Sequence, residues 1–153
     1  IKDNGFLVML DHIEDPHNFG AIIRTCEVAG VDGIIIPKDR SVEVNSTVMK
    51  TSAGALTNVK IVMVTNLKNT IDKLKDKGYW ICASDIMGES YNKVDYKTSV
   101  CLIVGSEGNG ISKIVKDSSD FIISIPMFGE INSLNASVAA GILIYEVIRQ
   151  KNS

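Results

Sequence analysis

The stretch "VGSEGNGIS" (residues 104–112) follows the apolar run "CLIV" (101–104) and leads into a helix-like segment. An apolar run of strand length that ends in a glycine-rich loop is typical of a buried strand turning into a helix. The loop also carries a carboxylate, Glu107, which is unexpected where glycines offer backbone N–H groups to an anion. These residues therefore predict one strand–loop–helix unit and raise the question of which ligand such a loop accepts.

Further apolar runs have the length of strands and do not alternate strictly with polar residues. Together with "CLIVG" (101–105) they are "FLVML" (6–10), "GIIIP" (33–37), "KIVMV" (60–64), "WICAS" (80–84) and "FIISIP" (121–126). Strands without alternation are covered on both faces, as in a parallel sheet. Helical spacing is found in 19–29, ending at Gly30, and in 66–77, which Thr65 or Asn66 can cap and Gly78 ends. We predict a single α/β domain with a mostly parallel sheet flanked by helices.

The last predicted helix, "NASVAAGILIYEVIRQ" (135–150), is apolar nearly all round for its first three turns. A terminal helix has one sheet to pack on, so a second apolar face needs a second partner. We favour another copy of the same chain over complete burial in the chain's own core, because a domain of this size rarely encloses a terminal helix.

The composition is that of an ordinary globular protein, with 45% hydrophobic residues, 22% charged residues and a net charge of −2. This charge disfavours a protein that is basic over its whole surface, although a local basic patch remains compatible with it. We find no apolar run of about 20 residues and no signal peptide, so a cytoplasmic location is expected. The scattered cysteines Cys26, Cys82 and Cys101 are interpreted as buried free thiols.

Ligands of open α/β sheets bind at the carboxyl ends of the strands, so the loops after the apolar runs are the candidates for a site. The first is "DHIEDPHNFGAIIRT" (11–25), in which Asn18 helps to shape a turn and Arg24 lies in the helix that follows. Only three arginines occur beside thirteen lysines, which indicates a need for the planar guanidinium at Arg24. His12 and His17 lie beside aspartates, but their spacing fits no zinc pattern, so we expect no metal site.

The glycine loop matches neither established phosphate-binding pattern. No lysine follows its glycines as in GxxxxGK[ST], and their order is GxxGxG rather than GxGxxG. The carboxylate of Glu107 would also repel a phosphate in a low-dielectric pocket. Alternatively, the loop is a tight strand–helix turn with Glu107 as a helix-start acid.

The third loop is "IPMFGEINSLN" (125–135). Ser133 and Asn135 are good caps for the last helix, while Met127 and Phe128 offer apolar surface to a flat ring such as adenine. Together the loops supply backbone groups, apolar walls, a carboxylate and an arginine, without a phosphate cradle. A ligand with a nucleoside, a cation and no phosphate fits this set, and S-adenosylmethionine is such a ligand.

Three segments also resemble the motifs of the SpoU (TrmH-like) branch of the SPOUT methyltransferases. They are "DPHNFGAIIRT" (15–25), "VGSEGNGIS" (104–112) and "IPMFGEINSLNASVAAGILIYE" (125–146), in the family's order. The stretches "PKDRSVEVNSTVMKTSAGAL" (37–56) and "VTNL" (64–67) look most like the bacterial branch that methylates a guanosine 2′-hydroxyl of large-subunit ribosomal RNA.

The resemblance implies an enzyme that uses S-adenosylmethionine to methylate a ribose 2′-hydroxyl in RNA. It implies a deep C-terminal trefoil knot that forms the cofactor pocket, and a homodimer packed through the last helix. The catalytic residues that it implies are Asn18, Arg24, Glu107, Ser133 and Asn135. The cofactor-binding residues that it implies, including a loop at Ser84–Asp85, are Ser84, Gly105, Glu107, Gly108, Ile125, Met127 and Leu134.

Residues 1–153 are interpreted as the family's catalytic domain, and the first residue, Ile1, agrees with the absence of the small N-terminal RNA-binding domain of such relatives. In the expected mechanism Arg24 grips a phosphate beside the target ribose and stabilises the developing alkoxide, while Asn18 and Glu107 orient it. Alternatives are a transfer-RNA target, a non-catalytic RNA-binding or assembly module with the same fold, and a nucleotide-dependent α/β enzyme.

Overall fold

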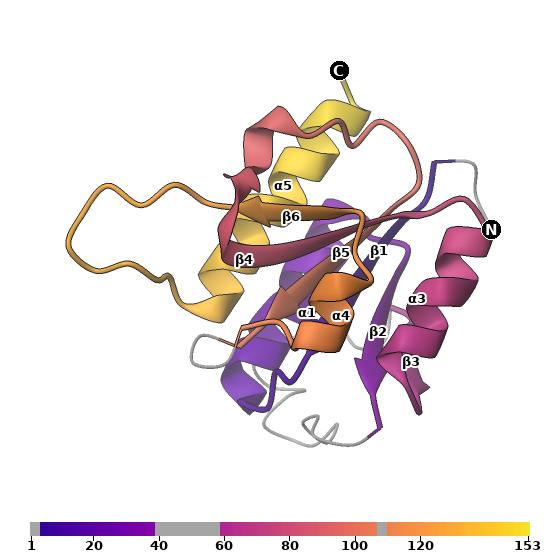
Figure 1. Cartoon of the computed structure of the whole chain (residues 1–153). Coiled ribbons are helices and arrows are strands. Elements are labelled where there is room, and N and C mark those ends of the chain that lie inside the picture. The colour runs from indigo at the N-terminus through magenta and orange to yellow at the C-terminus, as the bar shows by residue number, and fades with distance from the viewer. Residues whose placement is uncertain (1–3, 39–58, 107–109) are drawn as a thin grey trace.

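A computed structural model of the chain describes residues 4–38, 59–106 and 110–153 (Figure 1). The elements follow the alternation expected from the sequence. In chain order they are β1 (Phe6–Asp11), α1 (Pro16–Ala29), β2 (Gly33–Pro37), β3 (Ile61–Val64), α3 (Leu67–Asp76), β4 (Trp80–Ser90), the 3-10 turn η2 (Tyr91–Lys93), β5 (Val100–Gly105), α4 (Lys113–Asp117), β6 (Phe121–Ser124) and α5 (Ala136–Lys151).

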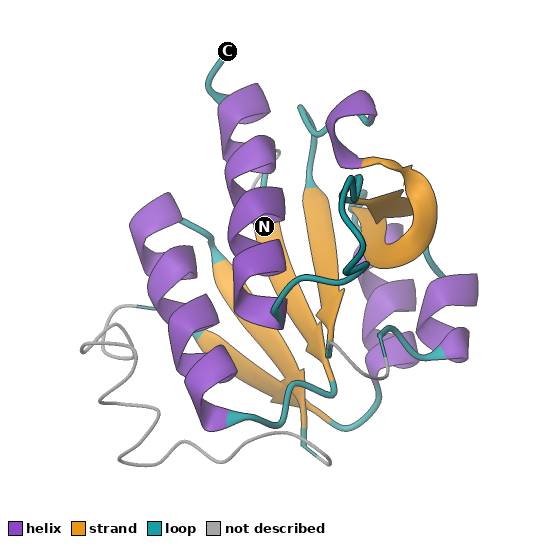
Figure 2. Cartoon of the chain, turned by 90° about the vertical axis from the view of Figure 1, so that its left-hand side faces the viewer, coloured by secondary structure: helices purple, strands orange, loops and turns teal. Residues whose placement is uncertain are grey.

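Six strands form one sheet in the order β3-β2-β1-β5-β4-β6, and every pair in it is parallel. Helices α1 and α5 cover one face of the sheet, and α3 and α4 cover the other (Figure 2). The parallel sheet flanked by helices is therefore confirmed. The knot that the resemblance implies stays a prediction.

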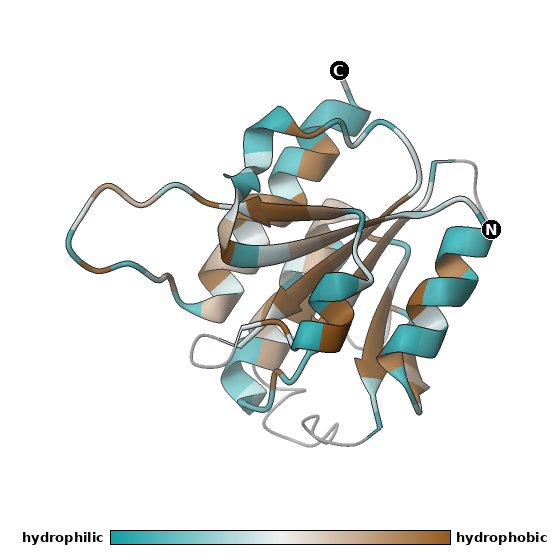
Figure 3. Ribbon diagram, viewed as in Figure 1, coloured by the Kyte–Doolittle hydropathy of each residue, from teal (hydrophilic) through white to brown (hydrophobic). Residues whose placement is uncertain are grey.

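The two-sided cover explains why the strands are apolar without alternation. Along β5, Leu102 and Val104 pack toward α1 and α5, whereas Cys101 and Ile103 pack toward α3 and α4. Figure 3 shows most of the strands in the hydrophobic colour, whereas hydrophilic and hydrophobic colours alternate along α3. Because both strand faces are buried, a polar substitution at either set of positions would disrupt a core.

The helix signals in the sequence act as expected at most ends. Asp15 caps α1 by accepting a hydrogen bond from His17 N at 2.9 Å, and Gly30 ends that helix with a left-handed φ of 79°. Asn66 caps α3 by accepting from Asn69 N at 3.0 Å. Helix α1 begins at Pro16, three residues before the expected start, because proline suits the first helical position.

Strand β4 differs from its prediction, since it continues past Ser84 to Ser90. It bulges between Ser84 and Glu89, so that both residues face Ile123 of β6. Gly88 permits this return, because a Cβ there would lie 2.5 Å from Ile122 O. Residues 85–90 contain only two adjacent apolar residues, Ile86 and Met87, and so give no apolar run of strand length, which is why the sequence pattern ended the strand too early. Strand β6 in turn ends at Ser124 instead of residue 126, before the proline that cannot donate to a ladder.

Candidate active site

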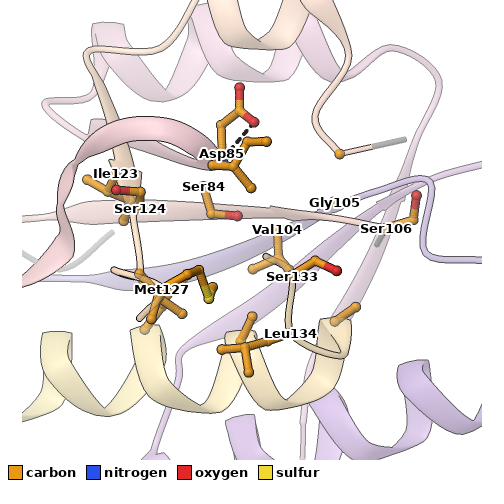
Figure 4. A pocket seen from close by; sticks show the side chains of 16 residues that line it. Ser84, Asp85, Val104, Gly105, Ser106, Ile123, Ser124, Met127, Ser133 and Leu134 are labelled. Carbon is orange, nitrogen blue, oxygen red and sulfur yellow. Dashed lines mark hydrogen bonds between the residues drawn. The ribbon is translucent and has the colours of Figure 1, made fainter. Parts of the chain in front are cut away.

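A pocket of about 270 Å³ lies where the carboxyl ends of β5 and β6 and the bulge of β4 meet the first half of α5 (Figure 4). Its lining is mostly apolar and interrupted by serine hydroxyls. The lining residues are Ser84, Asp85, Ile86, Val104, Gly105, Ser106, Gly110, Ile123, Ser124, Ile125, Met127, Ser133, Leu134, Ala136, Ala139 and Leu143. Its position agrees with the rule that ligands bind at the carboxyl edge of a parallel sheet.

The pocket wall after β5 requires glycine. A Cβ on Gly105 would lie 2.2 Å from Gly110 O, a contact with backbone that cannot move aside. Gly110 N donates to Ser106 O at 2.8 Å, and Gly110 has a left-handed φ of 61°. We call Gly105, Ser106 and Gly110 the glycine wall. It brings main-chain atoms close to any ligand in the pocket.

Asp85 is the one ionisable side chain among the described pocket residues. Its Oδ1 accepts from its own neighbour, Ile86 N, at 2.8 Å, and its Oδ2 forms an ion pair with Lys116 Nζ of α4. In Figure 4 the carboxylate points away from Met127 and Leu134. The pairing with Lys116 compensates the Asp85 charge, so the described lining presents an apolar, hydroxyl-bearing surface.

The loops of the first and third motifs meet outside this pocket. Asn135 Nδ2 donates to Asn18 Oδ1 at 3.1 Å, and Asn135 also caps α5 by accepting from Ser137 N at 2.9 Å. Of the two expected caps of the last helix, Asn135 takes that role, while Ser133 lines the pocket two residues earlier. The cap and the asparagine contact together fix how α5 begins relative to α1.

Arg24 lies on α1 and is exposed to solvent. It does not line the pocket, and in the described part of the chain no ion pair or hydrogen bond of its side chain is found. Glu107 and Gly108, and residues 39–56 of the stretch that indicated the ribosomal branch, lie outside the described residues. The expectation that Glu107 and Asn18 orient Arg24 therefore stays a prediction.

Most residues expected around the cofactor lie together. Ser84, Gly105, Ile125, Met127 and Leu134 all line the pocket, from three separate segments of the chain. Sequence reasoning missed the contribution of α5, which supplies Ala136, Ala139 and Leu143. Their spacing of three and four residues places them on one helix face. This spacing can be seen in the sequence, but it does not by itself tell which face of α5 borders a pocket.

The other residues that could carry chemistry are the histidines, the cysteines and the acidic side chains outside the pocket. Among residues 4–38, 59–106 and 110–153, no group of three or more histidine, cysteine or acidic side chains could hold a metal ion. The three cysteines are free and buried, as expected. Burial raises the pKa of the Cys26 and Cys82 thiols to about 12, so neither is poised as a nucleophile. In the same described ranges, no helix is long and apolar enough to cross a membrane.

Fold and site thus define an α/β protein with a ligand pocket at the carboxyl edge of a parallel sheet. Residues 5–145 match the model of the SpoU rRNA methylase family, and the chain belongs to this family. A TrmH-family tRNA/rRNA methyltransferase of Staphylococcus saprophyticus is 50% identical over 147 residues, which are 95% of this chain and 59% of the relative. The chain therefore spans about three fifths of the length of that curated relative.

Solved structures agree with this assignment. The SpoU methyltransferase AviRb of Streptomyces viridochromogenes, in complex with S-adenosylmethionine, superposes with a TM-score of 0.91 at 27% identity, over 100% of this chain and 60% of AviRb. The TrmH/SpoU tRNA-modifying enzyme of A. aeolicus gives 0.90 at 32% identity, over 99% of this chain and 77% of that enzyme. An S-adenosylmethionine-bound rRNA methyltransferase of Sinorhizobium meliloti gives a TM-score of 0.90 at 29% identity, over 97% of this chain and 57% of that enzyme.

Proposed function

We propose that this chain is the catalytic domain of an RNA methyltransferase that transfers a methyl group from S-adenosylmethionine to a ribose 2′-hydroxyl. The observation that carries the proposal is the pocket that Ser84, Gly105 and Leu134 line together, at the place where the family resemblance expects the methyl donor. Two of the similar structures, from Streptomyces viridochromogenes and Sinorhizobium meliloti, are described as S-adenosylmethionine complexes.

The pocket's chemistry fits this cofactor. A Cβ on Gly105 would overlap Gly110 O, so glycine at this position lets the two parts of the glycine wall lie together and offer main-chain atoms to an adenosine. The side chains of Ile125, Met127 and Leu134 supply apolar surface to a flat base. When bound, S-adenosylmethionine supplies an electrophilic methyl group on a sulfonium. The residues of this chain bind and orient it, and they exclude water from it.

The acceptor is proposed to lie on the side of Arg24, Asn18 and Asn135. The ribose oxygen would bond to the methyl carbon as the carbon–sulfur bond breaks, the demethylated cofactor would leave as a neutral thioether, and the hydroxyl proton would pass to solvent. The negative charge that develops on the oxygen needs stabilisation. Arginine keeps its proton in proteins, so Arg24 is not assigned as the base. Its guanidinium would bind a phosphate next to the target ribose and stabilise the developing oxyanion, while Ser133 and the Asn18–Asn135 pair hold the surrounding loops.

The target we favour is a guanosine of large-subunit ribosomal RNA in the cytoplasm. The sequence of residues 37–56 supports it through its resemblance to that branch of the family. A transfer-RNA target is the second candidate, because the relative of A. aeolicus is described as a tRNA-modifying enzyme. Methylation of ribosomal and transfer RNA transcripts side by side distinguishes the two.

A homodimer through α5 belongs to the same proposal. Val138, Ile142 and Tyr145 follow one another at helical spacing on the side of α5 away from its buried residues. Val138 and Tyr145 are 51% and 46% exposed. An apolar stripe on an otherwise buried helix suits a second copy of the chain, which would present the same stripe.

Calorimetric titration of the chain with S-adenosylmethionine tests the proposal first, with Leu134→Arg as the variant that fills the pocket. We expect micromolar binding that the variant abolishes while its circular dichroism stays unchanged. Transfer of labelled methyl groups to RNA, with the product resistant to alkaline cleavage, then tests the 2′-hydroxyl as acceptor. We expect Arg24→Lys to retain cofactor binding and to lose at least about tenfold in transfer, because lysine lacks the planar fork.

A folded chain that binds neither S-adenosylmethionine nor its demethylated product would contradict the enzymatic proposal. It would favour the non-catalytic RNA-binding module of the same fold. An Arg24→Lys enzyme with full turnover would contradict the guanidinium role alone. Tight binding of NADH or ATP would instead support the alternative that the chain is a nucleotide-dependent α/β enzyme.

A further inference from the structure

The last residue of β1, Asp11, is a completely buried carboxylate that the proposed mechanism does not use. It lies opposite Gly105 in the parallel ladder of β1 and β5, and so borders the glycine wall of the pocket. A charged group without solvent is costly unless hydrogen bonds or opposite charges compensate it. The partners of Asp11 therefore indicate what this carboxylate does.

One oxygen of Asp11 holds the far end of the glycine loop. Ser112 N donates to Asp11 Oδ2 at 2.8 Å across 101 residues of sequence. Ser112 is also the cap residue of α4, so this bond ties the start of the helix to the end of β1. Gly105 at the near end is held by the sheet, and Ser106 and Gly110 are bridged between the two ends.

The other oxygen of Asp11 faces its neighbour in the chain. His12 Nδ1 lies 2.5 Å from Asp11 Oδ1, yet within the described residues this oxygen has no aligned hydrogen bond. His12 has a φ of 63°, the one left-handed backbone outside glycine in the described ranges. Such a conformation is strained and persists only where surrounding contacts enforce it. Its consequence here is that the imidazole turns back onto the buried carboxylate.

We infer that Asp11 is a positioning residue for the cofactor pocket, which fixes the glycine wall by accepting the Ser112 hydrogen bond. Gly105 and Gly110 have no side chains that could hold the wall by packing. Their placement depends on the sheet at one end and, at the other, on the packing of Ile111 in the core and on the bond from Ser112 to Asp11. The identity of the ligand rests on the proposed function, whereas the placement of the wall does not.

The chain offers a matched control at the opposite end of the same strand. There Asp32 Oδ2 accepts from Phe6 N at 2.8 Å, which is the same kind of carboxylate-to-backbone bond at the same distance. Asp11→Ala and Asp32→Ala each remove such a bond from β1. We expect both to lower the denaturation midpoint, but only Asp11→Ala to weaken S-adenosylmethionine binding, by about tenfold.

Two further variants separate the hydrogen bond from the bulk of the side chain. Asp11→Asn keeps an oxygen that can accept from Ser112 N, so we expect its cofactor affinity to stay within about threefold of the parent chain. Ser112→Pro deletes the donor and leaves the carboxylate in place, and the φ of −63° at Ser112 suits proline. We expect it to reproduce the affinity loss of Asp11→Ala, which keeps the inference testable if Asp11→Ala fails to fold.

Amide hydrogen exchange of the cofactor-free chain gives a readout independent of the ligand. Exchange in the peptide covering residues 110–117 should rise about tenfold in Asp11→Ala, and should stay unchanged in Asp32→Ala and Asp11→Asn. The inference is overturned if Asp11→Ala leaves exchange and affinity unchanged, if Asp32→Ala has equal effects on both, or if Asp11→Asn loses as much as Asp11→Ala. A parent chain that binds no S-adenosylmethionine, but shows this exchange pattern, would refute the proposed function and leave the positioning role standing.

Discussion

The side-chain amide of Asn135 donates a hydrogen bond to Asn18 Oδ1 at 3.1 Å, although the two residues lie 117 positions apart. Asn18 is in the first turn of α1, and Asn135 is the cap residue of α5. The contact therefore joins the first and third sequence motifs at the starts of two helices that pack on the same face of the sheet. It brings two predicted catalytic residues together at the carboxyl edge.

Asn135 both caps α5 and donates a hydrogen bond to Asn18, and the variant Asn135→Asp separates these two roles. Aspartate keeps the oxygen that caps α5 but has no N–H group to donate to Asn18. We expect the free energy of unfolding to stay within about 0.5 kcal/mol, because a carboxylate also suits a helix N-terminus. Methyl transfer should fall about tenfold or more. Denaturant melts and transfer assays measure the two effects.

The control for this experiment is Asn135→Ala, which removes the cap as well. We expect it to lose about 1 kcal/mol of stability in addition to the loss of transfer. Asn135→Asp with parental activity would show that the contact to Asn18 contributes nothing beyond the cap.

The glycine at position 105 is predicted to be irreplaceable. Gly105→Ala would place a Cβ 2.2 Å from Gly110 O and 2.4 Å from Gly110 C, and relief of that overlap requires the main chain to shift. We expect a loss of about 1–3 kcal/mol in stability and a loss of S-adenosylmethionine binding. Gly129→Ala is the matched control, since a Cβ there meets nothing within 4 Å. Equal melting temperatures and affinities of the two variants would contradict the close approach.

The fold could be predicted from the sequence because parallel strands covered on both faces are encoded by short-range pattern. The run "GIIIP" is strand β2 to the residue, and Gly30 ends α1 where a left-handed residue was expected. What escaped prediction depends on contacts between distant segments. The return of β4 past Ser84 is set by its packing on Ile123 of β6, which no local pattern in residues 85–90 reveals.

The candidate site shows the same division. Gly105, Ile125 and Leu134 were placed by motif and do line one pocket. By contrast, the sequence shows Asp11 only as the polar residue at the end of an apolar run. Its hydrogen bond from Ser112 N depends on how β1 and β5 align. Ser133 reads as a helix cap, but Asn135 two residues later takes the cap and leaves Ser133 to the pocket. The difference lies in where the chain turns, which short sequence windows do not determine.

The proposed dimer predicts that a charge on the α5 stripe separates the two copies. Val138→Glu places a carboxylate at a position that is 51% exposed in the single chain and would be buried between two copies. Burying an unpaired charge is unfavourable, so we expect a shift from dimer to monomer at micromolar concentration. Sedimentation velocity measures it. Ile114→Glu, at a 57% exposed position on the opposite sheet face, should leave the mass unchanged. A monomeric parent chain, or a dimeric Val138→Glu variant, would contradict this interface.

The buried thiols predict how reactivity and stability depend on pH. Burial raises the pKa of Cys26 and Cys82 to about 12, and it raises that of Cys101 further above its ordinary value. At pH 8 only about one in ten thousand of such thiols is ionised in the folded chain. We expect a thiol reagent to label none of the three cysteines in the native chain and all of them in denaturant.

The same shifts give the sign of the effect on stability. A folded pKa above the unfolded value favours the protonated thiol in the folded state, so this contribution is complete below about pH 9 and is lost as the pH rises toward 12. Denaturant melts at a series of pH values should therefore show a decline above about pH 9, and Cys26→Ala should show a shallower one. Native-state labelling within seconds at pH 8 would show that these thiols reach solvent in the folded chain. An equal decline in Cys26→Ala would show that the Cys26 thiol contributes nothing to the pH dependence.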